Sequence, residues 1–468
     1  MKTDPSTGPA ASSPDAGRRR LLARSGWLAA HAALGAAGWL GLRQPVQAAD
    51  YRALVVVFLA GGNDGHNVLV PTDGAYGDYQ RARANLALPR SSLVALPGTS
   101  AGHGFGLHPA LAPLAPLYAR GRLAFVANVG PLVQPTSAEQ VRAGTALLPP
   151  ALMSHSDQAQ VAFGWTGTED RSGWAGRALE ALPPSLRSPL SAVVTQGEEQ
   201  VVRGRQTAPA SFRFIGHRNI GISSQPSFPS DDAATPLVLD LAAWQSDNAY
   251  LNDYNRNLRR VIETTRAFSL AEQRAPALTQ DFGPGMLAEN LRGLARVIPV
   301  FREQGHRRQV FSVTAQGSYD THAEQRGSSP RTQDHQLSLL APALVAFDGA
   351  MESLGLGDSV TVLCLSEFGR TLRPSSGGGS EHAWGNHWWA IGGAVRGGQV
   401  LGQFPGLVLG GPDDVDEDRG GRHLPTTASD QVAASVLQWL GLPVDRLDDV
   451  LPWLSSFEQK TIGLLHAA

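Results

Sequence analysis

The stretch that decides the fold is Leu54–Asp64, which reads LVVVFLAGGND. From Arg52 to Ala60 the chain is a nearly continuous run of Val, Leu and Phe, which is typical of a strand buried on both faces. The Gly-rich sequence at 61–65 follows as a turn. Strands buried on both faces belong to parallel sheets covered by helices, so this first unit predicts an α/β fold.

Helices and strands are expected to alternate along the rest of the chain, which indicates a doubly wound, mostly parallel sheet with helices on both faces. Helical patterns cover 110–119, 154–163, 248–272, 286–304, 333–355 and 429–440, and strand patterns cover 123–128, 308–314, 359–365 and 387–395. Residues 186–245 instead carry short β-like runs and loop clusters. We therefore expect one α/β domain over residues 50–468, with 186–280 as an insert or cap.

Composition narrows the classes of partner. The chain has 468 residues and a formal net charge of −2, so nothing indicates nucleic acid or an anionic membrane surface as a partner. Cys364 is the only cysteine, which excludes an intramolecular disulfide and a thiolate metal cluster. It lies inside an apolar strand-like run and is interpreted as a small core residue.

The N-terminus has the features of an export signal. Arg18-Arg19-Arg20-Leu21-Leu22 precedes a weakly apolar run, and small residues follow at 46–49. The paired arginines resemble a twin-arginine signal, which bacteria use to export folded proteins. A membrane anchor is the alternative, but the run is short of the roughly 20 residues that a span needs. We expect a signal over residues 1–49, contact with the twin-arginine machinery, no stable membrane span, and a periplasmic or secreted protein.

Three later segments resemble Leu54–Asp64, because each places metal-ligand or anion-binding side chains where an apolar run is followed by a Gly-rich loop. They are Val310–His322, Val360–Thr371 and Gly379–His387. Because ligands of open α/β sheets bind at the carboxyl edge of the strands, side chains from these segments are expected to converge there. Carboxylates and imidazoles ligate divalent cations, here Zn, Mn, Mg or Ca. The candidate metal ligands are Asp64, Asp320, His322, Glu367 and His382.

Each candidate has an ordinary structural alternative. Asp64 in Asn-Asp-Gly, and Asp320 two residues before His322, also suit turns, because Asn, Asp and Gly are the usual turn formers. Glu367 can pair with Arg370 to fix a loop. His382 and its neighbour His387 can be loop histidines stacked on tryptophan, and His387 is the weaker metal candidate of the two.

Two residues are candidates for catalysis. Ser154 opens an expected helix, and the dipole at a helix N-terminus favours a bound anion and an alkoxide; its alternative is a serine that only caps the helix. Arg370 can bind a phosphate- or sulfate-like oxyanion with two parallel hydrogen bonds. The sequence around Ser100 matches G-x-S-x-G, but Pro97 precedes it and Gly104 follows, so the strand–turn–helix context of a serine esterase is missing.

Several motifs together carry a family resemblance over nearly all of the chain after the signal. They are FLAGGNDGHNVLVP, LHPALAPLAPLYARGRLAFVANVG, SHSDQAQ, LSEFGRT, AVRGGQVLGQFPG and LPTTASDQ. The sequence resembles the exported bacterial family known as domain of unknown function 1501, which is similar to the alkaline phosphatase and sulfatase superfamily. That resemblance implies a doubly wound fold with a metal-dependent site at the strand ends. It matches Asp64 to the superfamily's first-strand aspartate, Asp320 and His322 to its paired ligands, and His382 to its late histidine.

The leading functional hypothesis is metal-dependent hydrolysis of a phosphate or sulfate ester, on a small molecule or a polymer, with Ser154 as nucleophile. The alternative is an exported binding or assembly protein that keeps the fold without catalysis. The feature that supports this second hypothesis is that the superfamily has Asp-His where this chain has Ser366-Glu367. Trp384, Trp388 and Trp389 would then offer flat aromatic surface to a polysaccharide, or else pack in the core.

Overall fold

The computed structural model describes residues 50–196, 199–214, 239–315 and 319–466. The expected signal at 1–49 lies outside these residues. The chain divides into two units, 1–47 and 48–468, and all described elements belong to the second. No helix in the described part of the chain is long and apolar enough to cross a membrane.

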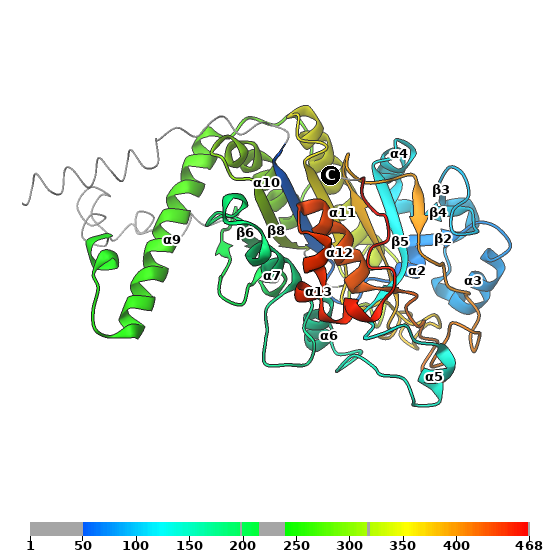
Figure 1. Ribbon diagram of the computed structural model, residues 1–468. Helices are drawn as coiled ribbons and strands as arrows, with labels where there is room; N and C mark the ends of the chain where they lie inside the picture. Colours follow the sequence, from blue (N-terminus) through cyan, green and yellow to red (C-terminus); the bar gives the residue numbers. More distant parts are fainter. Residues whose placement is uncertain (1–49, 197–198, 215–238, 316–318, 467–468) are drawn as a thin grey trace, which may run out of the picture. The chain divides into compact units, whose positions relative to one another are not determined.

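The main sheet defines the fold (Figure 1). Within the described residues its hydrogen-bonded order is β11 (Gln399–Leu401), β5 (Leu123–Gly130), β10 (Asn386–Ile391), β9 (Val360–Leu365), β1 (Arg52–Phe58), β8 (Arg308–Thr314), β6 (Ala192–Gln196) and β7 (Ala210–Ser211), with β12 (Thr427–Ala428) beside β5. A second sheet pairs β2 (Leu69–Pro71), β4 (Phe105–Leu107) and β3 (Val94–Ala95) in that order. The central strands are parallel, as the sequence predicts.

Helices cover both faces of the main sheet because β1 buries alternate residues on opposite sides. Val55 and Val57 pack in one core with α10 and α11, and Leu54 and Val56 pack in another with α7 and α12. The α-helices with both ends in the described part of the chain are α2 (Gly65–Val68), α3 (Tyr76–Arg83), α4 (Ala115–Ala119), α5 (Ala138–Arg142), α6 (His155–Ala162), α7 (Trp174–Ala181), α9 (Ala249–Arg274), α10 (Met286–Glu303), α11 (Gln333–Ser353), α12 (Ser429–Leu440) and α13 (Leu447–Val450). The predicted fold class, a mostly parallel α/β sheet with helices on both faces, is therefore confirmed.

Strand β10 is the exception to parallel order, since it runs antiparallel to both β5 and β9. Residues 366–385, which join β9 to β10, contain no helix. A parallel return needs a crossover connection, usually a helix, whereas an antiparallel return does not. The chain therefore turns back directly, and the start of β10 lies at the same edge of the sheet as the end of β9.

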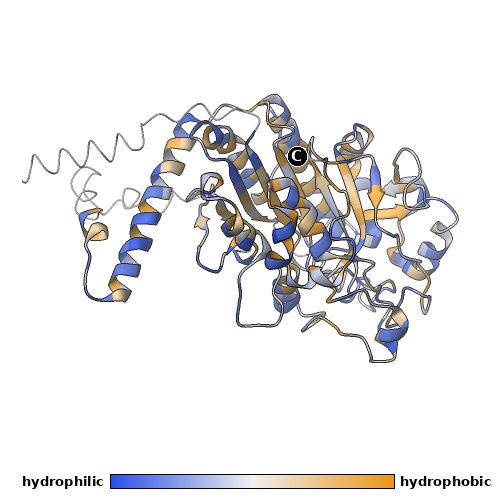
Figure 2. Ribbon diagram, viewed as in Figure 1, coloured by the Kyte–Doolittle hydropathy of each residue, from blue (hydrophilic) through white to orange (hydrophobic). Residues whose placement is uncertain are grey.

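The segment 186–280, expected to be an insert or cap, extends the main sheet in its described part. Strand β6 pairs with β8, and β7 pairs with β6 at the sheet edge. Helix α9 packs against α10, and hydrophilic and hydrophobic residues are mixed along its length (Figure 2). Residues 215–238 of the segment lie outside the described part of the chain.

Candidate metal centre

The candidate site lies at the carboxyl ends of three adjacent strands. In the parallel register, Phe58 at the end of β1 is level with Thr314 of β8 and Leu365 of β9. The turn after β1, the loop that contains Asp320, and Ser366-Glu367 therefore lie beside one another. A further bridge between Arg370 and His382 brings in the segment before β10. The parallel register of β1, β8 and β9, together with the antiparallel return into β10, thus brings these segments together although they are far apart in the sequence.

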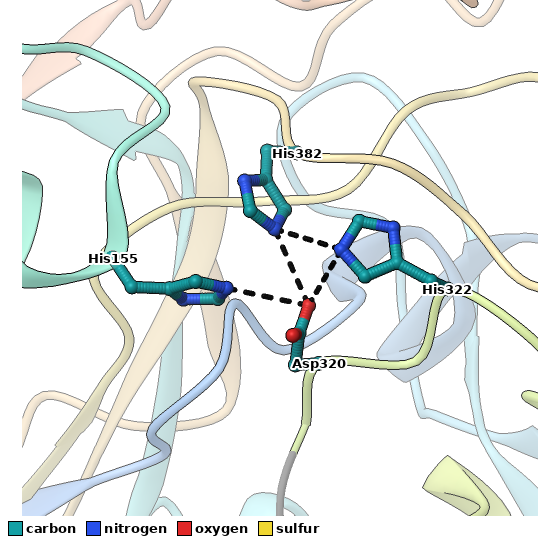
Figure 3. Close-up of side chains that lie close together, drawn as sticks. All are labelled: His155, Asp320, His322 and His382. Carbon is teal, nitrogen blue, oxygen red and sulfur yellow. Dashed lines mark hydrogen bonds and ion pairs between the residues drawn. The ribbon is translucent and has the colours of Figure 1, made fainter.

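Three histidines surround one carboxylate oxygen at this edge (Figure 3). Asp320 Oδ1 lies 2.9 Å from His322 Nε2 and 3.3 Å from both His155 Nε2 and His382 Nε2. His322 Nε2 and His382 Nε2 are 3.0 Å apart. One ligand atom from each of the four residues falls within 4.8 Å of the others. We call these four residues the metal cluster.

The outer nitrogen of each imidazole already faces an acceptor. His155 Nδ1 donates to Glu367 Oε1 at 2.9 Å, and His382 Nδ1 donates to the carbonyl of Met153 at 2.9 Å. His322 Nδ1 lies 2.6 Å from Glu381 Oε2. Because Nδ1 must carry the proton to donate, the Nε2 atoms of the neutral rings present lone pairs to the centre. An acceptor that binds the outer ring nitrogen in this way orients the histidine ligands of metals.

The cluster fits a cation in spacing as well as in chemistry. Metal–ligand distances of about 2.0–2.1 Å in a tetrahedral zinc site imply ligand–ligand separations of about 3.3 Å. Four separations between ligand atoms of the cluster, the three from Asp320 Oδ1 and the one between His322 and His382, run from 2.9 to 3.3 Å. His155 Nε2 is also buried, and the contact that it makes is the one with Asp320 Oδ1. Lone pairs that converge at these distances repel one another unless a proton or a cation lies between them.

Charges around the cluster keep its carboxylate ionised. Burial raises the pKa of Asp320, but the hydrogen bond and charge of Arg370 outweigh it and hold the pKa at about 2. The Glu367 carboxylate raises the pKa of His155, against the effect of burial. Burial lowers the pKa of His382. At neutral pH the cluster therefore offers an anionic oxygen and at least one neutral imidazole.

Glu367 lies behind the cluster. Its side chain is buried, and Oε1 accepts from the main-chain N–H of Gly61 at 2.7 Å as well as from His155. Ser366 Oγ is 3.0 Å from Oε2. Glu367 was a candidate ligand, and the structure places it as the hydrogen-bond partner of a histidine of the metal cluster, outside the four residues themselves.

Arg370 was a candidate for binding an oxyanion, and the structure gives its donors other partners. The side chain is fully buried, with Nε donating to the Gly62 carbonyl at 2.7 Å and Nη1 to the Ser380 carbonyl at 2.9 Å. Nη2 contacts the Gly61 carbonyl and lies 2.5 Å from Asp320 Oδ1. All three nitrogens are thus engaged, and the guanidinium holds the loops together and fixes the carboxylate of the cluster.

Asp64, the first expected ligand, is not part of the cluster. Its Oδ2 forms a fully buried ion pair with Arg83 and accepts from Gln325 Nε2 at 2.5 Å, while Oδ1 accepts from the main-chain N–H of His66 at 3.1 Å. These partners occupy both oxygens. Asp64 therefore caps the short helix α2 and anchors α3 through Arg83.

Ser154 precedes the histidine that sequence reasoning did not select. It occupies the N-cap position of α6, but its Oγ donates to Asp157 Oδ2 at 2.8 Å and makes no capping bond. His155 begins the helix and points its ring at Asp320 (Figure 3). The sequence signal for His155 is the motif SHSD at 154–157, in which this histidine directly follows Ser154.

His387 lies apart from the metal cluster and is buried.

Two hollows flank the metal cluster. One, of about 540 Å³, is lined by His155, Asp320 and Glu367 together with Phe163 and Gln200. The other, of about 500 Å³, is lined by His322, His382, Met153, Glu381, Arg419 and Arg422. The cluster is therefore reachable from both sides by a small molecule or by part of a polymer.

The fold and the site define an α/β protein with a three-histidine, one-carboxylate cluster at the carboxyl edge of its sheet. The chain belongs to the family described as "Protein of unknown function (DUF1501)", whose model matches residues 51–418. The family resemblance drawn from the sequence motifs is thereby confirmed. No curated protein shows significant similarity to the sequence.

Several solved structures share partial similarity with the chain. Lipoteichoic acid synthase LtaP from Listeria monocytogenes has 8% identity and a TM-score of 0.32, over 88% of this chain and 78% of that chain. The sulfatase PsFucS1 from Pseudoalteromonas sp. has 11% identity and a TM-score of 0.30, over 82% and 71%. Phosphonate monoester hydrolase SpPMH from Silicibacter pomeroyi has 9% identity and a TM-score of 0.31, over 84% and 74%. Similarities at this level carry no argument about activity.

Proposed function

We propose that the protein is a metal-dependent hydrolase of phosphate or sulfate esters. The observation that carries the proposal is the convergence of three imidazole Nε2 atoms on Asp320 Oδ1, with every Nδ1 already bound to an acceptor. Such an arrangement costs free energy unless a cation neutralises it. The resemblance to the alkaline phosphatase and sulfatase superfamily, set out above from the motifs, supports ester hydrolysis as the reaction.

His155, Asp320, His322 and His382 would hold the cation. Three imidazoles favour zinc over magnesium or calcium, which prefer oxygen ligands. When bound, a divalent cation polarises an ester oxygen and lowers the pKa of water. We propose that Asp320, held ionised by Arg370, supplies the negative charge of the site. Arg370 then acts on Asp320 and does not touch the substrate.

Ser154 is the nucleophile in this proposal. Its hydroxyl donates to Asp157, a carboxylate in position to accept the proton when the oxygen attacks. The two hollows beside the metal cluster would receive the two parts of the ester. We further propose that the twin-arginine-type N-terminus exports the folded protein to the periplasm or beyond, where a small-molecule or polymer ester would be its substrate.

A binding or assembly role without catalysis is the second candidate, and one observation favours it. Each nitrogen of the Arg370 guanidinium is engaged with the protein, so this arginine offers little to a transferring oxyanion. A metal cluster beside two hollows can also bind an anionic ligand without turnover.

Metal content and turnover separate the candidates. The mature chain, purified without chelator or affinity metal, would be measured by inductively coupled plasma mass spectrometry beside Asp320→Ala/His322→Ala. It would then be assayed with p-nitrophenyl phosphate, bis(p-nitrophenyl) phosphate and p-nitrophenyl sulfate. We expect about one equivalent of zinc, absent from the variant, together with zinc-dependent turnover that Ser154→Ala abolishes. Bound zinc with no turnover of any ester would favour the binding role, and protein that takes up no zinc would overturn the metal site itself.

A further inference from the structure

A second group of histidines is buried at the same edge of the sheet, separate from the metal cluster. His66, His387 and His423 are 5%, 3% and 2% exposed, and Asn128 at the end of β5 is 1% exposed. The ring centroids of His66 and His423 lie 5.0 Å apart and those of His66 and His387 lie 6.1 Å apart, each pair edge to face. We call these four residues the histidine pocket.

Polar atoms in the histidine pocket lack partners. Within the described residues, the buried atoms His66 Nδ1, His387 Nε2 and Asn128 Oδ1 have no hydrogen-bond partner, and the His423 ring faces the main-chain carbonyl of Gly406. Buried polar atoms in folded proteins are nearly always hydrogen-bonded, to the protein or to ordered water. Three unpartnered atoms on three neighbouring side chains therefore indicate a shared ligand.

The tautomers decide what that ligand is. His387 Nδ1 accepts from the main-chain N–H of Asn128 at 3.1 Å, so the proton of this neutral ring is on Nε2, which is a donor. The His66 ring donates to the main-chain carbonyl of Arg370, which leaves its unpartnered Nδ1 as an acceptor. Asn128 Nδ2 donates to the Leu424 carbonyl at 2.8 Å, which identifies its unpartnered Oδ1 as an acceptor too. The pocket thus mixes donors and acceptors.

A metal ion requires lone pairs from all its ligands, and the N–H of His387 excludes that residue from such a set. Water can accept from the His387 N–H and donate to His66 and Asn128 at the same time. We propose that the histidine pocket is a binding site for ordered internal water. This water completes the hydrogen bonding of His66, His387 and Asn128 behind the segment that carries Arg370.

A crystal structure of the mature protein at about 1.5 Å resolution or better tests the proposal, with data collected above and below the zinc absorption edge. We expect water density within hydrogen-bond distance of His387 Nε2 and of at least one of His66 Nδ1 and Asn128 Oδ1, with no anomalous signal. An anomalous peak among the three rings would assign a metal and overturn the proposal. Rings that contact one another with no density between them would overturn it as well.

Solution measurements on variants provide a second test. Water ¹⁷O magnetic relaxation dispersion counts long-lived internal waters, and His66→Leu/His423→Leu removes two of the polar side chains from the pocket. We expect this variant to lose at least one long-lived water relative to the wild type. The control, His466→Leu at an exposed position, should lose none. An unchanged count in the folded double variant would contradict the proposal, and the wild-type crystal structure decides the question if that variant does not fold.

Discussion

His322 and His382 bring their Nε2 atoms to 3.0 Å from each other, while the Nδ1 atom of each ring faces an acceptor. Two neutral rings in these tautomers would direct lone pairs at one another. In metal-free protein these lone pairs repel each other, at a cost in the free energy of folding. A cation bound to both nitrogens removes that cost.

Zinc is accordingly expected to stabilise the folded protein. At a free concentration one hundred times the dissociation constant, it should raise the free energy of unfolding by about 2.7 kcal/mol, and chelation should reverse the gain. Thermal unfolding with EDTA and with added zinc measures the shift. His322→Ala/His382→Ala is the control and should show no zinc-dependent shift. An equal shift in this variant would mean that zinc acts at another place.

The acceptors bound to the Nδ1 atoms of the histidines should also affect the affinity of the site for zinc. Glu381 Oε2 lies 2.6 Å from His322 Nδ1, the ring nitrogen that faces away from the centre of the cluster. Glu381→Ala is expected to weaken zinc binding about 10- to 100-fold, because outer partners orient a ligand and raise its basicity. Competition with a chromophoric chelator measures the dissociation constant. Glu169→Ala, at an exposed position, is the matched control, and equal affinities for the two variants would remove Glu381 from the site.

The sequence predicts much of the fold because hydrophobic periodicity is local. The expected strand at 308–314 and helix at 429–440 coincide with β8 and α12. The antiparallel course of β10 was not predicted, since it depends on the connection from β9 and not on the strand's own residues. Strand register and the antiparallel return then bring together Asp320 and His322, which were selected after a strand end, and His382, which was selected in the Gly-rich segment before the next strand.

The roles of His155 and Asp64 depend on tertiary contacts, which the spacing of residues in the sequence does not reveal. His155 comes from a helix start, where no strand-end rule applies. Asp64 follows a strand end as a ligand would, but Arg83, on the next long helix of the chain, returns to pair with it. A carboxylate near a sheet edge can bind a cation or a buried arginine, and only the packing of α3 distinguishes the two.

Replacing Asp64 tests that assignment. Asp64→Asn leaves the Arg83 guanidinium buried without its counter-charge, so the free energy of unfolding should fall by about 3–5 kcal/mol, while zinc content stays unchanged. Urea unfolding and metal analysis measure both quantities. Asp78→Asn breaks the exposed pair with Arg81 and is the matched control, with an expected loss of at most about 1 kcal/mol. Loss of zinc from folded Asp64→Asn would restore Asp64 as a ligand.

Asp430 gives the protein a pH-dependent weakness at the start of α12. Burial raises the pKa of Asp430 to about 7, although the charge of Arg177 opposes the shift. Below the ordinary pKa of 3.8 the folded and unfolded states are both protonated, so the group costs nothing. As the pH rises towards 7, the carboxyl of the unfolded chain ionises first, and the free energy of unfolding falls.

Asp430→Asn should therefore have little effect at pH 4 and should stabilise the protein by about 2–4 kcal/mol at pH 8. Urea unfolding at pH 4, 6 and 8 measures this dependence, and a gain that does not grow with pH would mean that the pKa of Asp430 is not raised in the folded protein.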